Sequence, residues 1–290
     1  MPAEVVCAHP NPTVSVIIPS LDGDRGGNVG RLVDDLGRQT LRDIEIILSV
    51  GERPNGHARN VGASIARGSY LAFFDDDVIL GDEHVLRNMI GAIERTPGLG
   101  LVGTSQLCPP GSTWKQRWLA RDLARGEFPV VDVLTETDMA THAGMALSRD
   151  VWEEVGGESD TLVTGTDSDL RHRLRSRGLR VAVAPRVWVF HPQPDSITRV
   201  LRRAWVHGRY QVEYRQVHPE PVGFLPFTFL DSPWALLKHV AIECLVLPVH
   251  VFITDRRLTP GFTPIRALHR WLMAMGYAYE WLALGRKTPA

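Results

Sequence analysis

Cysteine is scarce in this chain, and its scarcity excludes two kinds of small fold. The 290 residues include three cysteines, Cys7, Cys108 and Cys244, which lie far apart and form no Cys-x-x-Cys pair. Neither a disulfide framework nor a zinc knuckle is therefore indicated. The first ten residues also lack a basic stretch followed by an apolar run, so no signal peptide is recognised. These features lead us to expect a cytoplasmic protein.

An excess of charge of either sign is also missing. The chain has 32 Lys and Arg against 33 Asp and Glu, for a formal net charge of -1. Proteins that bind nucleic acid over a wide surface usually have a basic balance, so we expect no nucleic-acid partner. With 44% hydrophobic and 22% charged residues, the composition is that of a globular protein. The length allows one large α/β domain with an appendage, or two modest domains.

Long uncharged apolar segments are missing as well. Residues 234–253 are apolar but contain Lys238, Glu243 and Pro248. A membrane-spanning helix needs about 20 mostly uncharged residues, so we expect no span here. Residues 265–284 place several Trp and Tyr beside arginines. This second segment suits either a helix packed on the preceding domain or a helix at a membrane interface, and peripheral association through 234–284 at the inner face stays open.

What the chain does have is an alternation of apolar strands and amphipathic helices. Strands are predicted at residues 14–18, 44–48, 70–74, 99–103, 141–147 and 179–188, and helices at 28–36, 57–67, 82–96, 150–155, 170–177 and 197–217. Asn28, Asp82 and Ser148 are each placed to cap a following helix, whereas residues 109–138 predict an irregular excursion over one side of a cleft. This rhythm predicts a parallel sheet covered by helices, with ligands bound beyond the carboxyl ends of the strands.

The strand at 70–74 leads directly into three consecutive carboxylates. Tyr-Leu-Ala-Phe-Phe does not alternate with polar residues, so it should be buried on both faces and should deliver Asp75, Asp76 and Asp77 to one edge of the sheet. Carboxylates this close repel one another and need positive charge nearby. A divalent cation with a preference for hard oxygen ligands, Mg²⁺ or Mn²⁺, would supply it. The alternative is a solvated acidic turn that caps the next helix.

Five motifs in a fixed order carry a resemblance to a known family. They are Val14–Ser20, Ala58–Gly62, Asp75–Asp77, Gly165–Leu170 and His191. In this order they resemble the family 2 glycosyltransferases over about residues 13–215. The resemblance implies an α/β chain of GT-A fold, with a mostly parallel, Rossmann-like sheet covered by helices and a helical C-terminal appendage. We therefore expect a GT-A domain at 1–217 (donor half about 13–105, acceptor half about 106–217), a Pro-rich linker at 218–233 and a helical region at 234–290.

The resemblance also implies an activity and a metal site. In the family, a metal-dependent enzyme moves a sugar from a nucleotide-sugar donor to an acceptor hydroxyl with inversion. Asp75 and Asp77 match its Asp-x-Asp motif, in which the last Asp touches Mg²⁺ or Mn²⁺ and the first holds sugar or ribose hydroxyls and is a second metal-ligand candidate. His191 matches a third ligand after the last strand. Asp76 is expected to point toward buried partners and is counted among the donor-binding residues.

A second acidic motif supplies the expected base. Inverting transfer needs a group that takes the proton of the acceptor hydroxyl, and Asp167 matches the second member of the family's acidic pair. Thr166 stands where many relatives have Glu, which is a departure from the pattern. Asp169 is expected to cap the helix or to pair with Arg171 or Arg173. The alternative for the whole motif is N-terminal helix capping, worth about 1 kcal/mol.

The remaining expected contacts are to the donor. Arg59 and Asn60 are predicted to orient it, since a guanidinium makes paired hydrogen bonds to phosphate. Pro19, Ser20 and Asp22, at the first strand and its loop, are further candidates. Relatives carry two Asp after the second strand that hold the nucleobase or ribose. This chain has only Glu52 there, so the sequence does not predict whether the base is uridine, guanosine or thymidine.

Two other functions remain as alternatives. One is a non-catalytic GT-A-like protein that binds a nucleotide sugar or docks a partner, which Thr166 and the missing Asp pair would suit. The other, less favoured, is a haloacid-dehalogenase-type phosphatase, whose nucleophile loop also joins an apolar strand to Asp-x-Asp. The helix at 197–217 keeps only Arg203-Ala-Trp205 of the motif found in processive relatives, so polymer synthesis is not indicated. The sequence does not name the acceptor, an unknown sugar or lipid-linked molecule; a lipid-linked acceptor is favoured if the membrane interpretation holds.

Overall fold

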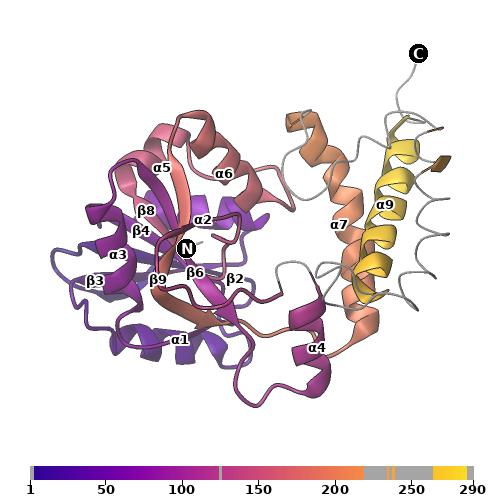
Figure 1. Cartoon of the computed structure of the whole chain (residues 1–290). Helices are drawn as coiled ribbons and strands as arrows, with labels where there is room; N and C mark the ends of the chain where they lie inside the picture. Colours follow the sequence, from indigo (N-terminus) through magenta and orange to yellow (C-terminus); the bar gives the residue numbers. More distant parts are fainter. Residues whose placement is uncertain (1–2, 124–125, 219–233, 235–236, 239–263, 286–290) are drawn as a thin grey trace. The chain divides into compact units, whose positions relative to one another are not determined.

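The computed structural model describes residues 3–123, 126–218, 234, 237–238 and 264–285 (Figure 1). The chain divides into two compact units. Unit 1 comprises residues 1–112 and 127–192, and unit 2 comprises residues 113–126 and 193–290. Unit 1 is a sheet covered by helices, and the described part of unit 2 is helical. The expected domain boundary at 217 therefore differs from this division, which assigns the helix at 197–217 to unit 2.

Unit 1 is built on a nine-stranded sheet with the order β1-β3-β2-β4-β8-β6-β9-β5 and with β7 paired to β9. β3, β2 and β4 are parallel to one another, as are β6 and β9, whereas β8 is antiparallel to both β4 and β6. The α/β class is thus confirmed, with a mixed rather than a mostly parallel sheet. The strands are β1 Ala3–Ala8, β2 Val14–Ser20, β3 Ile44–Val50, β4 Tyr70–Phe73, β5 Ile79–Leu80, β6 Leu99–Leu107, β7 Thr135–Glu136, β8 Met145–Ser148 and β9 Arg180–Phe190.

Helices cover both faces of this sheet (Figure 1). α1 (Asn28–Gly37) and α3 (Val85–Arg95) pack on one face, while α2 (Asn55–Ser64), α5 (Arg149–Val155) and α6 (Thr166–Ser176) pack on the other. Successive strand residues point to opposite sides, so Val16 joins the first apolar cluster and Ile17 the second. This two-sided burial explains why the strands lack polar alternation. Gly62 allows α2 to approach the sheet, because a Cβ there would lie 2.5 Å from Ile17.

The expected helix caps are partly confirmed. Ser148 caps α5, and its side chain accepts a hydrogen bond from the Val151 N–H. Asn28 does not cap α1: Gly27, with φ 81°, is the cap residue, and the Asn28 amide donates to the Arg25 carbonyl. Asp82 does not cap α3 either. Its Oδ1 accepts from the His84 N–H at 2.8 Å, His84 is the cap residue, and α3 begins at Val85.

The described part of unit 2 consists mainly of α4 (Trp114–Asp122), α7 (Ile197–Val217) and α9 (Pro264–Gly285). α7 and α9 lie side by side (Figure 1) and touch backbone to backbone: a Cβ at Gly208 would lie 2.0 Å from the Met273 carbonyl oxygen. Arg209 Nε donates to Glu280 Oε2 at 2.6 Å across the pair. The predicted excursion at 109–138 therefore includes a helix. The predicted linker lies, apart from His218, outside the described residues, as does most of 234–253.

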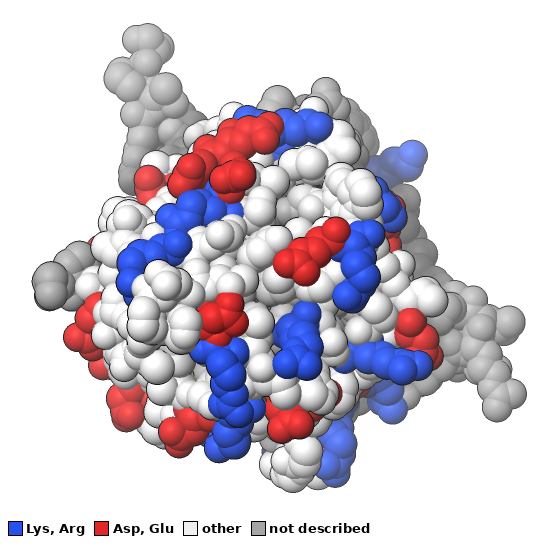
Figure 2. Space-filling model, turned by 90° about the vertical axis from the view of Figure 1, so that its left-hand side faces the viewer, with Lys and Arg blue, Asp and Glu red and all other residues white. Residues whose placement is uncertain are grey.

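Two surface properties bear on the expected partners. On the face shown in Figure 2, acidic and basic side chains alternate in small groups, in agreement with the near-zero net charge. Among the helices that the structure describes, none combines the length and the apolar character that a membrane span requires.

Candidate active site

The acid triplet Asp75–Asp77 follows β4 at its carboxyl end, where we expected it. The Asp75 N–H donates to the His142 carbonyl at 3.0 Å, which extends the antiparallel pairing of β4 with β8. The three carboxylates then diverge. Asp75 binds Arg59, Asp76 binds Ser20, and Asp77 faces Arg25 and His191.

Asp76 is the buried member of the triplet. Its Oδ2 accepts a hydrogen bond of 2.7 Å from the Ser20 hydroxyl, which β2 carries at its own carboxyl end. Burial raises the pKa of Asp76, and repulsion from the neighbouring carboxylates Asp77 and Asp75 raises it further. The hydrogen bond from Ser20 and the charge of Arg25 lower it, but the net shift is upward. Pro19 is buried in β2 in register with Ser49 of β3, so its visible role is to position Ser20.

Asp77 and His191 come together from distant parts of the chain. His191 follows β9, where its N–H donates to the Leu107 carbonyl at 2.9 Å, and its Nε2 lies 3.7 Å from Asp77 Oδ1. Ligands about 2.1 Å from one octahedral ion lie roughly 3 Å apart, so small movements would bring both onto one cation. Within the described ranges, no three His, Cys, Asp or Glu side chains form a metal-holding group, so Asp75 does not complete a set of three. Two protein ligands still fit Mg²⁺ or Mn²⁺, which commonly take their other oxygens from phosphate and water.

Arg59 is completely buried and connects Asp75 to a second carboxylate. Its Nη2 donates to Asp75 Oδ1 at 2.7 Å, and its Nη1 lies 3.7 Å from Glu158 Oε2. Glu158 is also buried and binds His142 Nε2 through Oε1. Arg59 thus lies behind Asp75 rather than in the open. Glu158 and His142 were missed from the sequence, because neither belongs to a motif and each gains its partners only through folding.

Asn60, on α2, and Glu52, in the loop before α2, lie near this network. The Asn60 side chain accepts from the Glu158 N–H at 2.9 Å and donates to the Glu158 carbonyl at 2.8 Å. His57 bridges Glu52 and Asp160, with Nε2 3.3 Å from the first carboxylate and Nδ1 3.0 Å from the second. Hydrogen bonds from Asn60 and His57 lower the pKa of Asp160. Asn60 therefore holds the loop after α5 against α2, and Glu52 pairs with His57, which contacts the same loop through Asp160.

Asp22 and Arg25 belong to the loop between β2 and α1. Asp22 is exposed, and its Oδ1 accepts from the N–H groups of Arg25 at 2.8 Å and Asp24 at 3.1 Å. These hydrogen bonds lower the pKa of Asp22. Arg25, which no motif indicated, donates to Asp77 Oδ2 at 2.9 Å. The loop therefore brings a cation onto the triplet.

Asp167 stands in the first turn of α6 (Thr166–Ser176). Its Oδ2 accepts a hydrogen bond of 2.9 Å from Arg171, a buried side chain that also donates to the Ala140 carbonyl. Asp169 pairs with Arg173, which is one of the two expected partners. Thr166 is buried, and a Cβ at Gly56 would lie 3.2 Å from its Cγ2.

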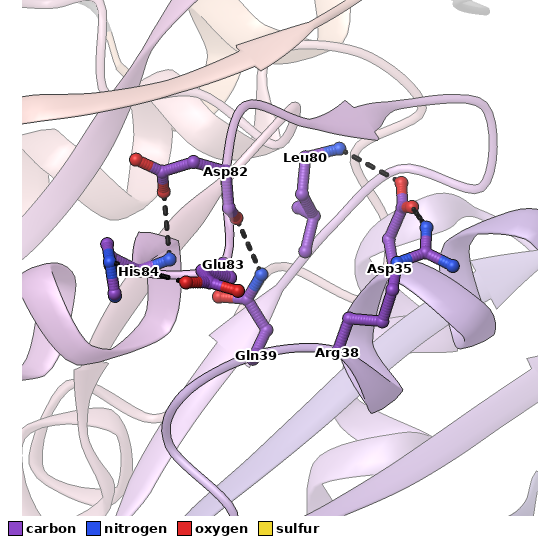
Figure 3. Close-up of a pocket in the computed structure, with 7 residues that line it drawn as sticks. All are labelled: Asp35, Arg38, Gln39, Leu80, Asp82, Glu83 and His84. Atoms are coloured by element: carbon purple, nitrogen blue, oxygen red, sulfur yellow. Dashed lines mark hydrogen bonds and ion pairs between the residues drawn. The ribbon is translucent and has the colours of Figure 1, made fainter.

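A hollow of about 570 Å³ lies elsewhere, between the end of α1 and the turn before α3 (Figure 3). Asp35 and Asp82, two of its carboxylates, bind backbone N–H groups. Asp35 accepts from the Leu80 N–H at 3.3 Å and pairs with Arg38, and Asp82 accepts from the His84 N–H at 2.8 Å. The hollow is acidic for structural reasons, and we assign it no function.

Comparisons with known proteins agree with this geometry. Residues 3–208 match the family described as "Glycosyltransferase like family 2". The chain is 24% identical over 228 residues to glycosyltransferase AglE of Haloferax volcanii, which covers 78% of this chain and 70% of the relative. Among solved structures it is similar to the mannosyltransferase PcManGT from Pyrobaculum calidifontis in complex with GDP-Man and Mn²⁺. That match has a TM-score of 0.59 and 15% identity, and covers 97% of this chain and 91% of the other.

The family match spans most of the chain and includes all five motifs, which decides against the phosphatase alternative. The chain belongs to the glycosyltransferase family 2-like proteins, and its fold is that of a GT-A glycosyltransferase.

Proposed function

We propose that this glycosyltransferase is metal-dependent and inverting, and that it moves a sugar from a nucleotide-sugar donor to an acceptor hydroxyl. The observation that carries the proposal is the meeting of Asp77 and His191, 3.7 Å apart, at the carboxyl edge of the sheet. Both side chains are partly exposed, at 16% and 29%, so they can reach a ligand without unfolding the core.

Asp77 and His191 would hold Mg²⁺ or Mn²⁺, and the ion would neutralise the charge that develops on the departing diphosphate. Asp75 would accept hydrogen bonds from hydroxyls of the donor. Arg59, buried behind it, fixes the direction of that carboxylate and compensates its charge. The hydrogen bond of 2.7 Å from the Ser20 hydroxyl to Asp76 ties the acid triplet to the carboxyl end of β2 and so fixes the position of Asp75 and Asp77.

Asp167 would accept the proton of the acceptor hydroxyl. The acceptor oxygen forms a bond to the anomeric carbon from one side while the bond from that carbon to the diphosphate oxygen breaks on the other. The leaving electron pair goes to the diphosphate, and the configuration inverts. Arg171 donates to Asp167 Oδ2 at the start of α6 and so orients the carboxylate, whose other oxygen, Oδ1, would take the proton.

The partners in this proposal are a nucleotide-sugar donor and a sugar or lipid-linked sugar acceptor. We propose a cytoplasmic reaction, with peripheral membrane association through 234–284 if the acceptor is lipid-linked. The similar mannosyltransferase structure from Pyrobaculum calidifontis contains GDP-Man. GDP-mannose is for this reason the first donor to test, beside UDP- and dTDP-linked sugars.

The test is a thermal-shift screen of nucleotide sugars with and without Mn²⁺, followed by donor hydrolysis and transfer assays. A ligand that binds only the folded state increases the free energy of unfolding by mass action, by about 2.7 kcal/mol at a ligand concentration of 100 times Kd. The melting temperature rises as a result. We expect one nucleotide series to stabilise the protein only when Mn²⁺ is present. Stabilisation without any turnover would favour the non-catalytic alternative, and equal stabilisation with and without Mn²⁺ would contradict the metal assignment.

A further inference from the structure

Arg25 occupies a position on the acid triplet that no motif predicted. Its Nη2 lies 2.9 Å from Asp77 Oδ2 and its Nε lies 3.6 Å from Asp76 Oδ1. The residue has φ 51°, a backbone conformation that is uncommon for a side chain other than Gly, Asn or Asp. Strained residues of this kind are concentrated at functional sites, so its placement calls for a reason.

We propose that Arg25 is a donor-binding residue that exchanges partners: it neutralises Asp77 before the metal arrives, and then turns to the diphosphate of the bound nucleotide sugar. This inference rests on the proposed function, because it takes Asp77 to be a metal ligand.

The charges of the site support the first half of this exchange. Three adjacent carboxylates share two guanidinium groups, Arg59 on Asp75 and Arg25 on Asp77 and Asp76. Arg59 is completely buried and cannot leave without stranding the Glu158 carboxylate, which is also completely buried. A divalent cation that joins Asp77 adds two positive charges beside Arg25. The repulsion between the two cations weakens the hold of Arg25 on the triplet.

The loop itself supports the second half. The Arg25 side chain is 52% exposed, so it can turn without disturbing the core. Its backbone is held separately, because Asp22 accepts the Arg25 N–H and the Asn28 amide donates to the Arg25 carbonyl. A guanidinium is suited to two diphosphate oxygens at once. The side chain can therefore move from a carboxylate to a phosphate while the loop stays in place.

The sharpest test measures two affinities in the full-length protein, for Mn²⁺ alone and for a nucleoside diphosphate in the presence of Mn²⁺. Arg25→Gln removes a competing cation, so Mn²⁺ alone should bind about threefold to fivefold more tightly, as expected for loss of one partly exposed ion pair. GDP, UDP and dTDP are then titrated separately by calorimetry. The one that binds should bind about tenfold more weakly, because charged hydrogen bonds to phosphate are lost.

Opposite changes in the two affinities are what a merely structural role would not produce. Arg38→Gln is the matched control: Arg38 is exposed, pairs with Asp35 on α1, and its loss makes the same change in net charge. Arg25→Lys should retain most of the competition with Mn²⁺ and lose part of the nucleotide affinity. Unchanged affinities in Arg25→Gln, or weaker binding of Mn²⁺, would overturn the exchange.

Asp77→Asn separates failure of this inference from failure of the proposed function. If Asp77→Asn abolishes Mn²⁺ binding and Arg25→Gln changes neither affinity, the metal site stands and the exchange is wrong. If neither the wild-type protein nor Arg25→Gln binds Mn²⁺, the metal site is wrong and the exchange falls with it. Tighter Mn²⁺ binding together with weaker nucleotide binding in Arg25→Gln supports both.

Discussion

The two ends of β2 each hold a serine bound to a buried carboxylate, yet the two carboxylates differ in character. At the amino end, Glu45 accepts from the Ser15 hydroxyl at 2.6 Å, from the Arg67 N–H at 2.6 Å and from Arg67 Nε at 2.8 Å. At the carboxyl end, Asp76 accepts from the Ser20 hydroxyl at 2.7 Å and has Arg25 at 3.6 Å. One carboxylate has three close donors and the other has one.

The pKa shifts of the two groups record this difference. Burial raises the pKa of Glu45, but hydrogen bonds from Ser15 and Arg67 outweigh it, and the net shift is downward. Burial also raises the pKa of Asp76, and there repulsion from two neighbouring carboxylates leaves the net shift upward. A carboxylate that serves only the fold is saturated with donors. The group in the candidate active site is left short of positive charge, which a bound cation can provide.

The largest effect is expected at the carboxyl end. Asp77→Asn should lower transfer by about 10²- to 10³-fold, since stabilisation of a leaving group by a metal ion is worth several kcal/mol. The change keeps the size of the side chain, so the melting temperature should stay near that of the wild-type protein. Product formation with Mn²⁺ measures the effect, and Asp34→Asn, at an exposed position on α1, is the control. Full activity in Asp77→Asn would refute the metal assignment.

At the amino end the expected effect is on stability instead. Glu45→Gln should cost about 2 kcal/mol of unfolding free energy, because the buried Ser15 hydroxyl and the Arg67 donors lose a charged acceptor. Urea denaturation measures this cost, with the exposed Glu153→Gln as the matched control. Activity per folded molecule should be unchanged. A large loss of activity without loss of stability would contradict our inference that Glu45, at the amino end of β2, stabilises the fold and takes no part in the reaction.

The pH dependence of stability should differ in sign between the two groups. The pKa of Glu45 is lowered by folding, so its contribution is present above the unfolded value of 4.5 and is lost as the pH falls through the native value. The pKa of Asp76 is raised, so its contribution is present below the unfolded value of 3.8 and is lost as the pH rises through the native value.

Asp76→Asn should therefore stabilise the protein above the native pKa of Asp76, by on the order of 1 kcal/mol at pH 7, because it removes a buried charge and keeps an acceptor for Ser20. Thermal unfolding measured from pH 3 to pH 8 tests this, with Asp34→Asn again as the control. The stability difference should grow as the pH rises from the unfolded value of 3.8 through the native pKa of Asp76, and a difference that stays constant over the whole range would contradict the upward shift.

The smallest effect is expected in the hollow of Figure 3, which is acidic but has backbone partners. Asp82→Asn should change stability by about 0.5 kcal/mol or less, because an amide oxygen can still accept the His84 N–H, and should leave transfer unchanged. Urea denaturation and the transfer assay measure the two quantities. A loss of transfer comparable to that of Asp77→Asn would give the hollow a function that we do not assign to it.

Much of the fold could be predicted from local pattern. The strands at β2, β3 and β4 and the helix α7 match their predicted residues closely, because unbroken apolar runs and long amphipathic periods are strong local signals. The antiparallel placement of β8 between β4 and β6 was not predicted, since strand direction depends on connections that no local pattern encodes. The start of α6 was placed four residues too late, at Leu170 rather than Thr166, because Asp167 and Asp169 suit a cap as well as a first turn.

Of the candidate site, the sequence by itself determined the family, the acid triplet and the order of its motifs, because these depend on residue type and spacing along the chain. Only the tertiary structure decided which charges meet. Arg25 reaches Asp77 across 52 residues, and Arg59 reaches Asp75 and Glu158 from a helix buried on the opposite side of the sheet from α1. Ion pairs act over a few ångströms in space, so side chains remote in sequence become partners only after the sheet and its helices have assembled.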